Sequence, residues 1–245
     1  MAALAEGPDD ARVERFGLEA RDGTRVDSIH ARPVGQPDAG IVVHPDMMGV
    51  RPLFDEQCRR LATHGFAVVC PEPFARFPRA VRESPDPTMR MAHMKDMDDE
   101  RQLDDLAQAA EYLAEEDGVE RVSIIGFCMG GMYTLKAAAT GTFARAVPFY
   151  GMIRVPDDWR GPGQRDALDT AARVCPTLAI FGGKDPWTPA DDIDALRVAW
   201  RDRDDCEIVV YPDADHGFVH APERPAHRPE DARDAWQRAL AFLRR

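Results

Sequence analysis

The chain of 245 residues lacks any apolar run long enough to cross a membrane as a helix. Its first fifteen residues carry Glu6, Asp9, Asp10 and Glu14, and they contain no apolar core of the kind that a signal peptide needs. These absences predict a chain with no removed leader and no membrane partner. We therefore expect a cytoplasmic protein.

Positive charge is also scarce. Lysine and arginine number 31 against 43 aspartates and glutamates, which leaves a formal net charge of −12. Such a balance argues against nucleic acid and against an anionic membrane surface as partners. It does not identify a substrate, because one arginine inside a pocket can outweigh the global field.

Cysteines are few and follow no pattern. There are five, an odd count, and Cys58, Cys70, Cys175 and Cys206 lie far apart without C-x-x-C spacing. This spacing predicts neither a disulfide framework nor a zinc site. We expect reduced thiols, no metal, and no organic cofactor.

Apolar runs of strand length alternate with amphipathic segments of helix length. A hairpin is predicted first, with strands at 12–19 and 24–31 around the turn Arg21-Asp22-Gly23. Short apolar strands are expected at 41–43, 66–70, 122–125, 146–150, 177–181 and 207–211, and helices at 54–64, 98–116, 191–201 and 229–243. This alternation predicts an α/β protein with a doubly wound, mostly parallel sheet covered by helices on both faces. We expect one domain over residues 1–245.

One long passage, residues 73–97, is predicted to be irregular because it contains four prolines and four methionines. Loops of this length inside a compact domain are usually functional. The passage could form a lid over a pocket, or it could be a surface excursion, and the sequence leaves both open.

The most informative stretch is Val-Ser-Ile-Ile-Gly-Phe-Cys-Met-Gly-Gly-Met-Tyr, residues 122–133. A β-branched run leads into Gly126, Cys128 follows, and Gly130 and Gly131 open an Ala-rich segment of helical composition. This is the strand, sharp turn and helix of a nucleophile elbow, G-x-S-x-G, with cysteine in the place of serine. Cβ atoms at Gly126 and Gly130 would collide with the neighbouring strand and helix. The alternative is that Cys128 is an ordinary buried thiol.

Two further segments carry residues that suit a cysteine nucleophile. Gly182-Gly183-Lys184-Asp185 follows a predicted strand, and Asp215-His216-Gly217-Phe218 follows the last one. A cysteine attacks as a thiolate, which an adjacent imidazole can generate, and a carboxylate can hold that imidazole in the productive tautomer. The chain order nucleophile, acid, histidine is that of α/β-hydrolases. Asp185 and His216 could otherwise be turn residues.

With its cysteine elbow and these two segments, the sequence from about residue 42 to the C-terminus resembles the dienelactone hydrolase (carboxymethylenebutenolidase) family. The resemblance implies an α/β-hydrolase fold, with Cys128 as nucleophile, Asp185 as acid and His216 as base. It also implies an oxyanion hole made by the backbone N–H groups of Met129 and Met47.

The same resemblance implies three polar positions in the substrate site. A glutamate of the family that modulates the thiol is replaced here by Asp46, which is one methylene shorter. Of two arginines that bind the substrate's carboxylate, one matches Arg76 and the other is His220, so the substrate could differ. Arg79, Arg82 or Arg51 could supply a second cation. Met48, Tyr150 and Trp187 are expected in the pocket walls.

These features predict a cysteine-dependent hydrolase of small esters or lactones that acts through a thioester acyl-enzyme. Two alternatives remain at this point: a carboxylesterase or thioesterase for a different, uncharged substrate, and a non-catalytic small-molecule binding protein that uses Cys128 as a thiol sensor. The oligomeric state is not predicted. The other histidines, His30, His44, His64, His93 and His227, are expected to be ordinary surface or loop residues.

Overall fold

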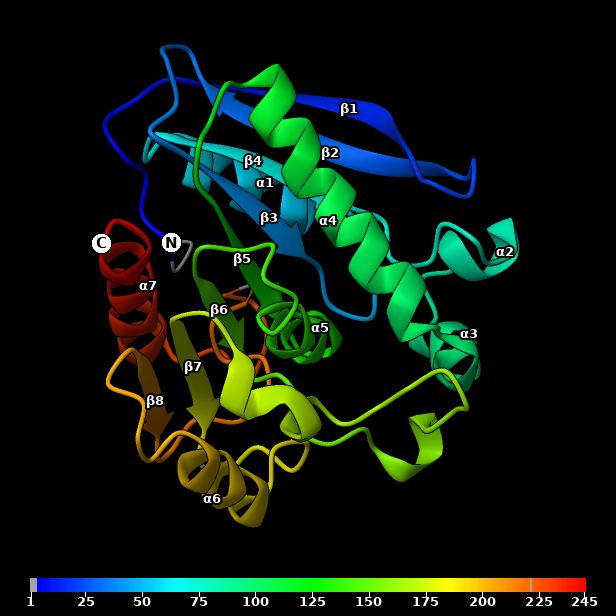
Figure 1. The fold of residues 1–245 in the computed structure, drawn as a ribbon, viewed down its shortest axis with the longest axis vertical. Helices are drawn as coiled ribbons and strands as arrows, with labels where there is room; N and C mark the ends of the chain where they lie inside the picture. Colours follow the sequence, from blue (N-terminus) through cyan, green and yellow to red (C-terminus); the bar gives the residue numbers. More distant parts are fainter. Residues whose placement is uncertain (1–3, 221) are drawn as a thin grey trace.

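A computed structural model describes residues 4–220 and 222–245. Its centre is a sheet of eight strands in the order β1-β2-β4-β3-β5-β6-β7-β8 (Figure 1). Strands β1 (Ala11–Glu19) and β2 (Arg25–Pro33) form the predicted hairpin, and β2 pairs antiparallel with β4. Every pairing from β4 to β8 is parallel. The parallel strands are β3 (Ala39–His44), β4 (Phe66–Pro71), β5 (Val122–Phe127), β6 (Ala146–Phe149), β7 (Thr177–Gly182) and β8 (Cys206–Tyr211).

Helices cover both faces of this sheet, which confirms the predicted fold class. On one face α1 (Pro52–Ala62) and α7 (Pro229–Leu243) pack around Phe54, Leu61 and Trp236. On the other face lie α4 (Asp99–Glu116), α5 (Met129–Ala137) and α6 (Ala190–Ala199), whose core includes Leu106 and Leu135. In Figure 1, α4 crosses in front of the sheet and α1 lies behind it. Strands β3 to β7 are buried along their whole length, as strands with two covered faces must be.

The passage at 73–97 is less irregular than its composition predicts. It contains two short helices, α2 (Arg79–Arg82) and α3 (Pro87–Met91), and the 3₁₀ turn η1 (Met94–Asp96). Asp86 caps α3 by accepting a hydrogen bond from Thr88 N at 2.9 Å, and Pro87 occupies the first turn, where no N–H is needed. Two further 3₁₀ segments, η2 (Asp157–Trp159) and η3 (Ala167–Arg173), precede β7.

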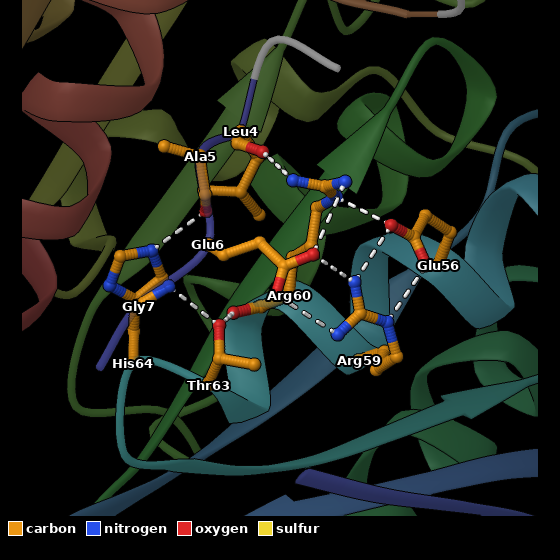
Figure 2. A network of polar contacts seen from close by, with 9 residues as sticks. All are labelled: Leu4, Ala5, Glu6, Gly7, Glu56, Arg59, Arg60, Thr63 and His64. Carbon is orange, nitrogen blue, oxygen red and sulfur yellow. Dashed lines mark hydrogen bonds and ion pairs between the residues drawn. The ribbon is translucent and has the colours of Figure 1, made fainter. Parts of the chain in front are cut away.

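The first described residues, 4–9, form an N-terminal strap across the end of α1 (Figure 2). The Glu6 carboxylate accepts a hydrogen bond from Arg59 Nη2 at 2.7 Å and lies 3.6 Å from Arg60 Nη2. Arg60 also donates from Nη1 to the Leu4 carbonyl at 3.0 Å. The Leu4 side chain is buried against the core that α1 and α7 share.

Two histidines expected at the surface are buried instead. His30 lies in β2, and its Nε2 is 2.8 Å from Asp117 Oδ2. His44 ends β3 and stacks on Tyr133, with ring centroids 5.2 Å apart. Burial lowers the pKa of His44 to about 4, so this ring is neutral at pH 7.

Across residues 4–220 and 222–245, none of the helices combines the length and the apolar character that crossing a bilayer requires.

Candidate active site

Cys128 occupies the turn between β5 and α5, and its backbone is strained. Its φ is 58° and ψ is −119°, a conformation that residues other than glycine rarely adopt. The Cys128 N–H donates to the Phe149 carbonyl at 3.1 Å, and the Cys128 carbonyl accepts from Met132 N at 3.0 Å. These bonds anchor the turn on both sides. The thiol therefore sits at the carboxyl end of the central strand and at the N-terminus of α5.

The glycines of the elbow are required by close backbone approaches, as predicted. A Cβ at Gly126 would lie 2.1 Å from the Gly130 carbonyl oxygen, and one at Gly130 would lie 2.2 Å from the His44 carbonyl oxygen. Both contacts are with backbone atoms, which cannot move aside as a side chain can. Any larger residue at either position would push α5 away from the sheet.

The two predicted partners of Cys128 lie together beside it. His216 Nδ1 is 2.8 Å from Asp185 Oδ2, and the Asp185 carboxylate is fully buried. Asp185 follows β7 and accepts a second hydrogen bond from Trp187 N at 2.8 Å, which fixes its orientation. His216 follows β8 and is only 18% exposed in its side chain. The parallel sheet thus brings residues from three separate loops to one edge, where its strands end.

The surroundings of His216 favour the protonated ring. Burial on its own would lower the pKa of His216, but the hydrogen bond to Asp185 and the nearby Cys128 outweigh it and raise the pKa to about 10. An imidazole that keeps its proton at neutral pH is suited to stabilise a neighbouring thiolate.

A cavity of about 500 Å³ opens above Cys128 and His216. Its volume suits a small molecule. Most of its wall is apolar, and the predicted wall residues Met48, Tyr150 and Trp187 all contribute to it. The residues that line it are Asp46, Met47, Met48, Arg51, Pro87, Met91, Cys128, Tyr150, Trp159, Trp187, His216, Gly217, His220 and Arg224. Pro87 and Met91 belong to α3, so the passage at 73–97 contributes to the cavity.

Asp46 lies in the cavity wall, but its carboxylate is held by other groups than the thiol. Arg51 donates to both oxygens, with Nη1–Oδ1 at 2.6 Å and Nη2–Oδ2 at 2.7 Å, and Met48 N donates to Oδ1 at 2.9 Å. His220 Nε2 is 3.2 Å from Oδ2. Burial alone would raise the pKa of the Asp46 carboxyl, but the neighbouring His220 and the hydrogen bonds from Arg51 hold it well below its usual value.

His220 is fully buried beneath the cavity. Burial lowers its pKa despite the neighbouring Asp46 carboxylate, so the residue that stands where the family has an arginine is not a fixed cation here.

The two residues whose N–H groups are expected to form the oxyanion hole, Met47 and Met129, lie in different parts of the site. Met47 lies in the loop after β3 and lines the cavity, whereas Met129 begins α5 and its side chain is buried. Neither N–H donates to an acceptor within residues 4–220 and 222–245. The two donors thus have no protein partner in the part of the chain that the structure describes.

Arg76 is not where the resemblance implies. Its guanidinium binds Asp105 through two hydrogen bonds of 2.6 and 2.9 Å, and Asp22 through a third of 2.7 Å. It lines a separate small pocket and does not reach the cavity above Cys128. Of the other arginines considered, Arg79 pairs with Glu83 and Arg82 with Asp27. Arg76 therefore lies outside the cavity above Cys128, contrary to the expectation that it contacts the substrate there.

Sequence reasoning also missed part of the cavity. Arg224 is a lining residue that forms no ion pair within the described part of the chain, and its guanidinium lies against Gly217, next to His216. Trp159 contributes a second indole beside Trp187, with centroids 5.4 Å apart. Neither residue belongs to a motif or a periodic segment, so no sequence signal marked them.

The described residues contain no group of three or more His, Cys, Asp or Glu side chains that could hold a metal ion.

Residues 26–245 match the model of the family described as "Dienelactone hydrolase family". The chain is 32% identical over 248 residues to the Escherichia coli (strain K12) protein named "Putative carboxymethylenebutenolidase", covering 99% of this chain and 91% of that protein. It is 28% identical over 219 residues to a Bradyrhizobium protein named "Probable 2-oxo-3-(5-oxofuran-2-ylidene)propanoate lactonase", covering 87% of each. The crystal structure titled "Putative Dienelactone Hydrolase" from Klebsiella pneumoniae matches with a TM-score of 0.87 and 30% identity, covering 96% of this chain and 99% of that one. The chain belongs to the dienelactone hydrolase family and has an α/β-hydrolase fold.

Proposed function

We propose that this chain is a cysteine-dependent hydrolase of small lactones or esters, acting through a thioester formed on Cys128. The observation that carries the proposal is the contact of His216 with the buried Asp185, next to a thiol held in strained backbone at the start of a helix. A thiol sensor would need neither an oriented imidazole nor its carboxylate partner, so this arrangement favours hydrolysis.

The reaction has two halves. The Cys128 thiolate attacks the carbonyl carbon, and the carbonyl π electrons move to oxygen, where the Met47 and Met129 N–H groups stabilise the oxyanion. The tetrahedral intermediate collapses to the thioester as the C–O bond breaks, and His216 protonates the departing oxygen. Water then attacks the thioester while His216 takes its proton, and Cys128 leaves as a thiolate. Asp185 holds the ring orientation throughout.

The charge at the cavity favours a substrate that carries a carboxylate. Arg51 is neutralised by Asp46, but Arg224 lines the cavity without forming an ion pair within residues 4–220 and 222–245. A guanidinium can bind a carboxylate through two parallel hydrogen bonds. The name of the Bradyrhizobium relative specifies a lactone with an acid group, which agrees with this substrate class.

An uncharged ester is the second candidate. It is favoured by the apolar walls, formed by residues such as Met48, Met91 and Trp187, and by the position of Arg76 outside the cavity. Such a substrate would bind by apolar burial and would not need Arg224.

Hydrolysis of a dienelactone, which is an acid, and of neutral 4-nitrophenyl acetate tests both candidates. Cys128→Ala should lower kcat on both compounds about 1,000-fold or more, while its fold stays intact. Arg224→Gln should lower kcat/KM for the dienelactone about 10- to 100-fold and change it less than about 3-fold for the acetate. Arg79→Gln removes the same charge from an exposed surface position and serves as the matched control.

Undiminished turnover by Cys128→Ala would overturn the proposal as a whole. If Arg224→Gln lowers kcat/KM equally for both compounds, or for neither, the uncharged ester is favoured instead.

A further inference from the structure

Glu72 is a buried carboxylate that two backbone N–H groups hold. It follows β4, its residue is 6% exposed, and it forms no ion pair within residues 4–220 and 222–245. Burial is the main influence on this carboxyl and raises the pKa of Glu72 above its usual value. Burying a carboxylate without an ion-pair partner destabilises the fold relative to an apolar residue. Fold stability alone therefore does not account for a glutamate at this position.

The hydrogen bonds of Glu72 lead to the loop that follows β3. Oε2 accepts from Val50 N at 2.8 Å, and Oε1 accepts from Phe74 N at 3.0 Å. The loop presses closely on the carboxylate, since a Cβ at Gly49 would lie 2.6 Å from each oxygen. Gly49 has a φ of +68°, which lets the backbone turn past the carboxylate without a side chain. Glu72, at the end of β4, is thus hydrogen-bonded to Val50 and packed closely against Gly49.

The loop that Glu72 holds contains Met47, which lines the cavity and whose N–H is the oxyanion donor of the proposed function. Its other end is fixed by the Asp46 carboxylate, which accepts from Met48 N and Arg51, and by a turn in which Gly49 N donates to the Asp46 carbonyl at 2.9 Å. The Met47 amide lies between these two anchors. If the Val50 anchor is lost, the loop keeps only the fixation on its Asp46 side.

We propose that Glu72 is a positioning residue for the oxyanion hole, which fixes the Met47 N–H through its hydrogen bond to Val50. This assignment rests on the proposed function, because it takes Met47 as an oxyanion donor. Two acceptor oxygens are needed, one for each N–H, and glutamate supplies both. Glutamine would turn an NH₂ group toward one of the two N–H groups, so one hydrogen bond would be replaced by two facing donors.

The experiment compares Glu72→Gln with wild type in three measurements: hydrolysis of 4-nitrophenyl acetate, inhibition by an aryl trifluoromethyl ketone, and alkylation of Cys128 by iodoacetamide. The ketone accepts the thiolate at its carbonyl carbon, which places a negative oxygen in the oxyanion hole. Alkylation needs the same thiolate but no oxyanion donor. Damage to the oxyanion hole should weaken hydrolysis and ketone inhibition but not alkylation. A merely structural defect would weaken all three.

For Glu72→Gln we expect kcat/KM to fall about 10- to 100-fold, with KM changed less than about 3-fold and the inhibition constant weakened in parallel. Alkylation of Cys128 should stay within about 2-fold of wild type. Glu72→Asp keeps the charge but is about 1.5 Å too short to reach both amides, so its kcat/KM should fall to a value between those of wild type and Glu72→Gln. It also carries the test if Glu72→Gln does not fold.

Asp117→Asn is the matched control, because Asp117 is another buried carboxylate, paired with His30 just after α4 and before the start of β5. It should lower stability and leave all three measurements unchanged. Wild-type kcat/KM or inhibitor binding in a folded Glu72 variant would overturn the assignment, and so would alkylation that falls by the same factor as kcat/KM. Failure of the proposed function would look different, since Cys128→Ala would then keep its turnover.

Discussion

Arg51 binds the Asp46 carboxylate through two parallel hydrogen bonds in the wall of the cavity above Cys128. Both oxygens are engaged, at 2.6 and 2.7 Å from the two terminal nitrogens of the guanidinium, and no hydrogen bond joins Asp46 to Cys128 within the described part of the chain. The titratable neighbour of the thiol is His216 instead. In this chain the Asp46 carboxylate organises the cavity wall, and under the proposed function the His216 imidazole prepares the nucleophile.

The first prediction tests this separation of roles with Asp46→Asn. The rate at which iodoacetamide alkylates Cys128 at neutral pH should change less than about 3-fold, because His216 still supports the thiolate. The free energy of unfolding should fall by about 1 to 3 kcal/mol, because Arg51 loses its buried partner. Asp55→Asn, which removes a partly exposed partner of Arg15, should change that free energy by less than about 1 kcal/mol. A tenfold loss of alkylation in Asp46→Asn would contradict the assignment.

A second prediction concerns the proton on His216. Its folded pKa of about 10 lies above the ordinary value of 6.5, so the folded state binds this proton more tightly than the unfolded state. The stabilisation is fully present below pH 6.5 and is lost as the pH rises to about 10. Urea unfolding between these pH values should therefore show a steeper decline for wild type than for His216→Gln.

The same pKa can be measured directly by NMR on labelled histidine. The Cys128 thiol is one of the groups that raise it, so Cys128→Ala should lower the pKa of His216 while leaving the Asp185 contribution in place. Titration of His216 near 6.5 in the wild type would show that the ring does not hold the proton that the proposed mechanism assigns to it.

A third prediction concerns His44. Burial lowers its folded pKa from 6.5 to about 4, so its contribution to stability is complete above pH 6.5 and is lost as the pH falls to about 4. His44→Phe keeps the stacking on Tyr133 but cannot take up a proton. It should be less stable at pH 7 by about 1 to 3 kcal/mol, because the oxygen that accepts the single N–H of the neutral ring, on Pro45 or on Gln102, loses its donor. Its stability should decline less between pH 6.5 and 4 than that of wild type, and an equal decline in urea unfolding would refute this.

The elements that the sequence predicts well are those governed by local patterns. Short apolar runs gave the buried strands, and proline in the first turn placed the start of the last helix at residue 229. The elbow was predictable because Gly126 and Gly130 meet backbone atoms that any strand, turn and helix of this kind would bring close. Local steric requirements of this type are written in the sequence itself.

The positions that sequence reasoning misplaced depend on distant partners. Arg76 turns away from the cavity because Asp105 and Asp22, 29 and 54 residues away in the chain, bind its guanidinium. His44 is buried because Gln102 and Tyr133, which belong to two different helices, surround its ring. A matching motif gives the position of such a residue in the chain. The position of its side chain in space depends on the partners that the tertiary fold brings close to it.

The last prediction concerns the N-terminal strap, whose hydrogen bonds are with the end of α1 that lies away from the cavity and with the two residues that follow it. Leu4 is 3% exposed and packs in the core, while Arg51 and the cavity lie at the other end, about 16 Å along the helix axis. Leu4→Ala should therefore lower the free energy of unfolding by about 2 kcal/mol and leave kcat/KM unchanged within about 2-fold. Val34→Ala shortens a side chain that is 58% exposed and should change stability by less than about 0.5 kcal/mol. A loss of kcat/KM in Leu4→Ala at a temperature where the protein is fully folded would mean that α1 transmits the position of the strap to Arg51, and that the two ends of the helix are not independent.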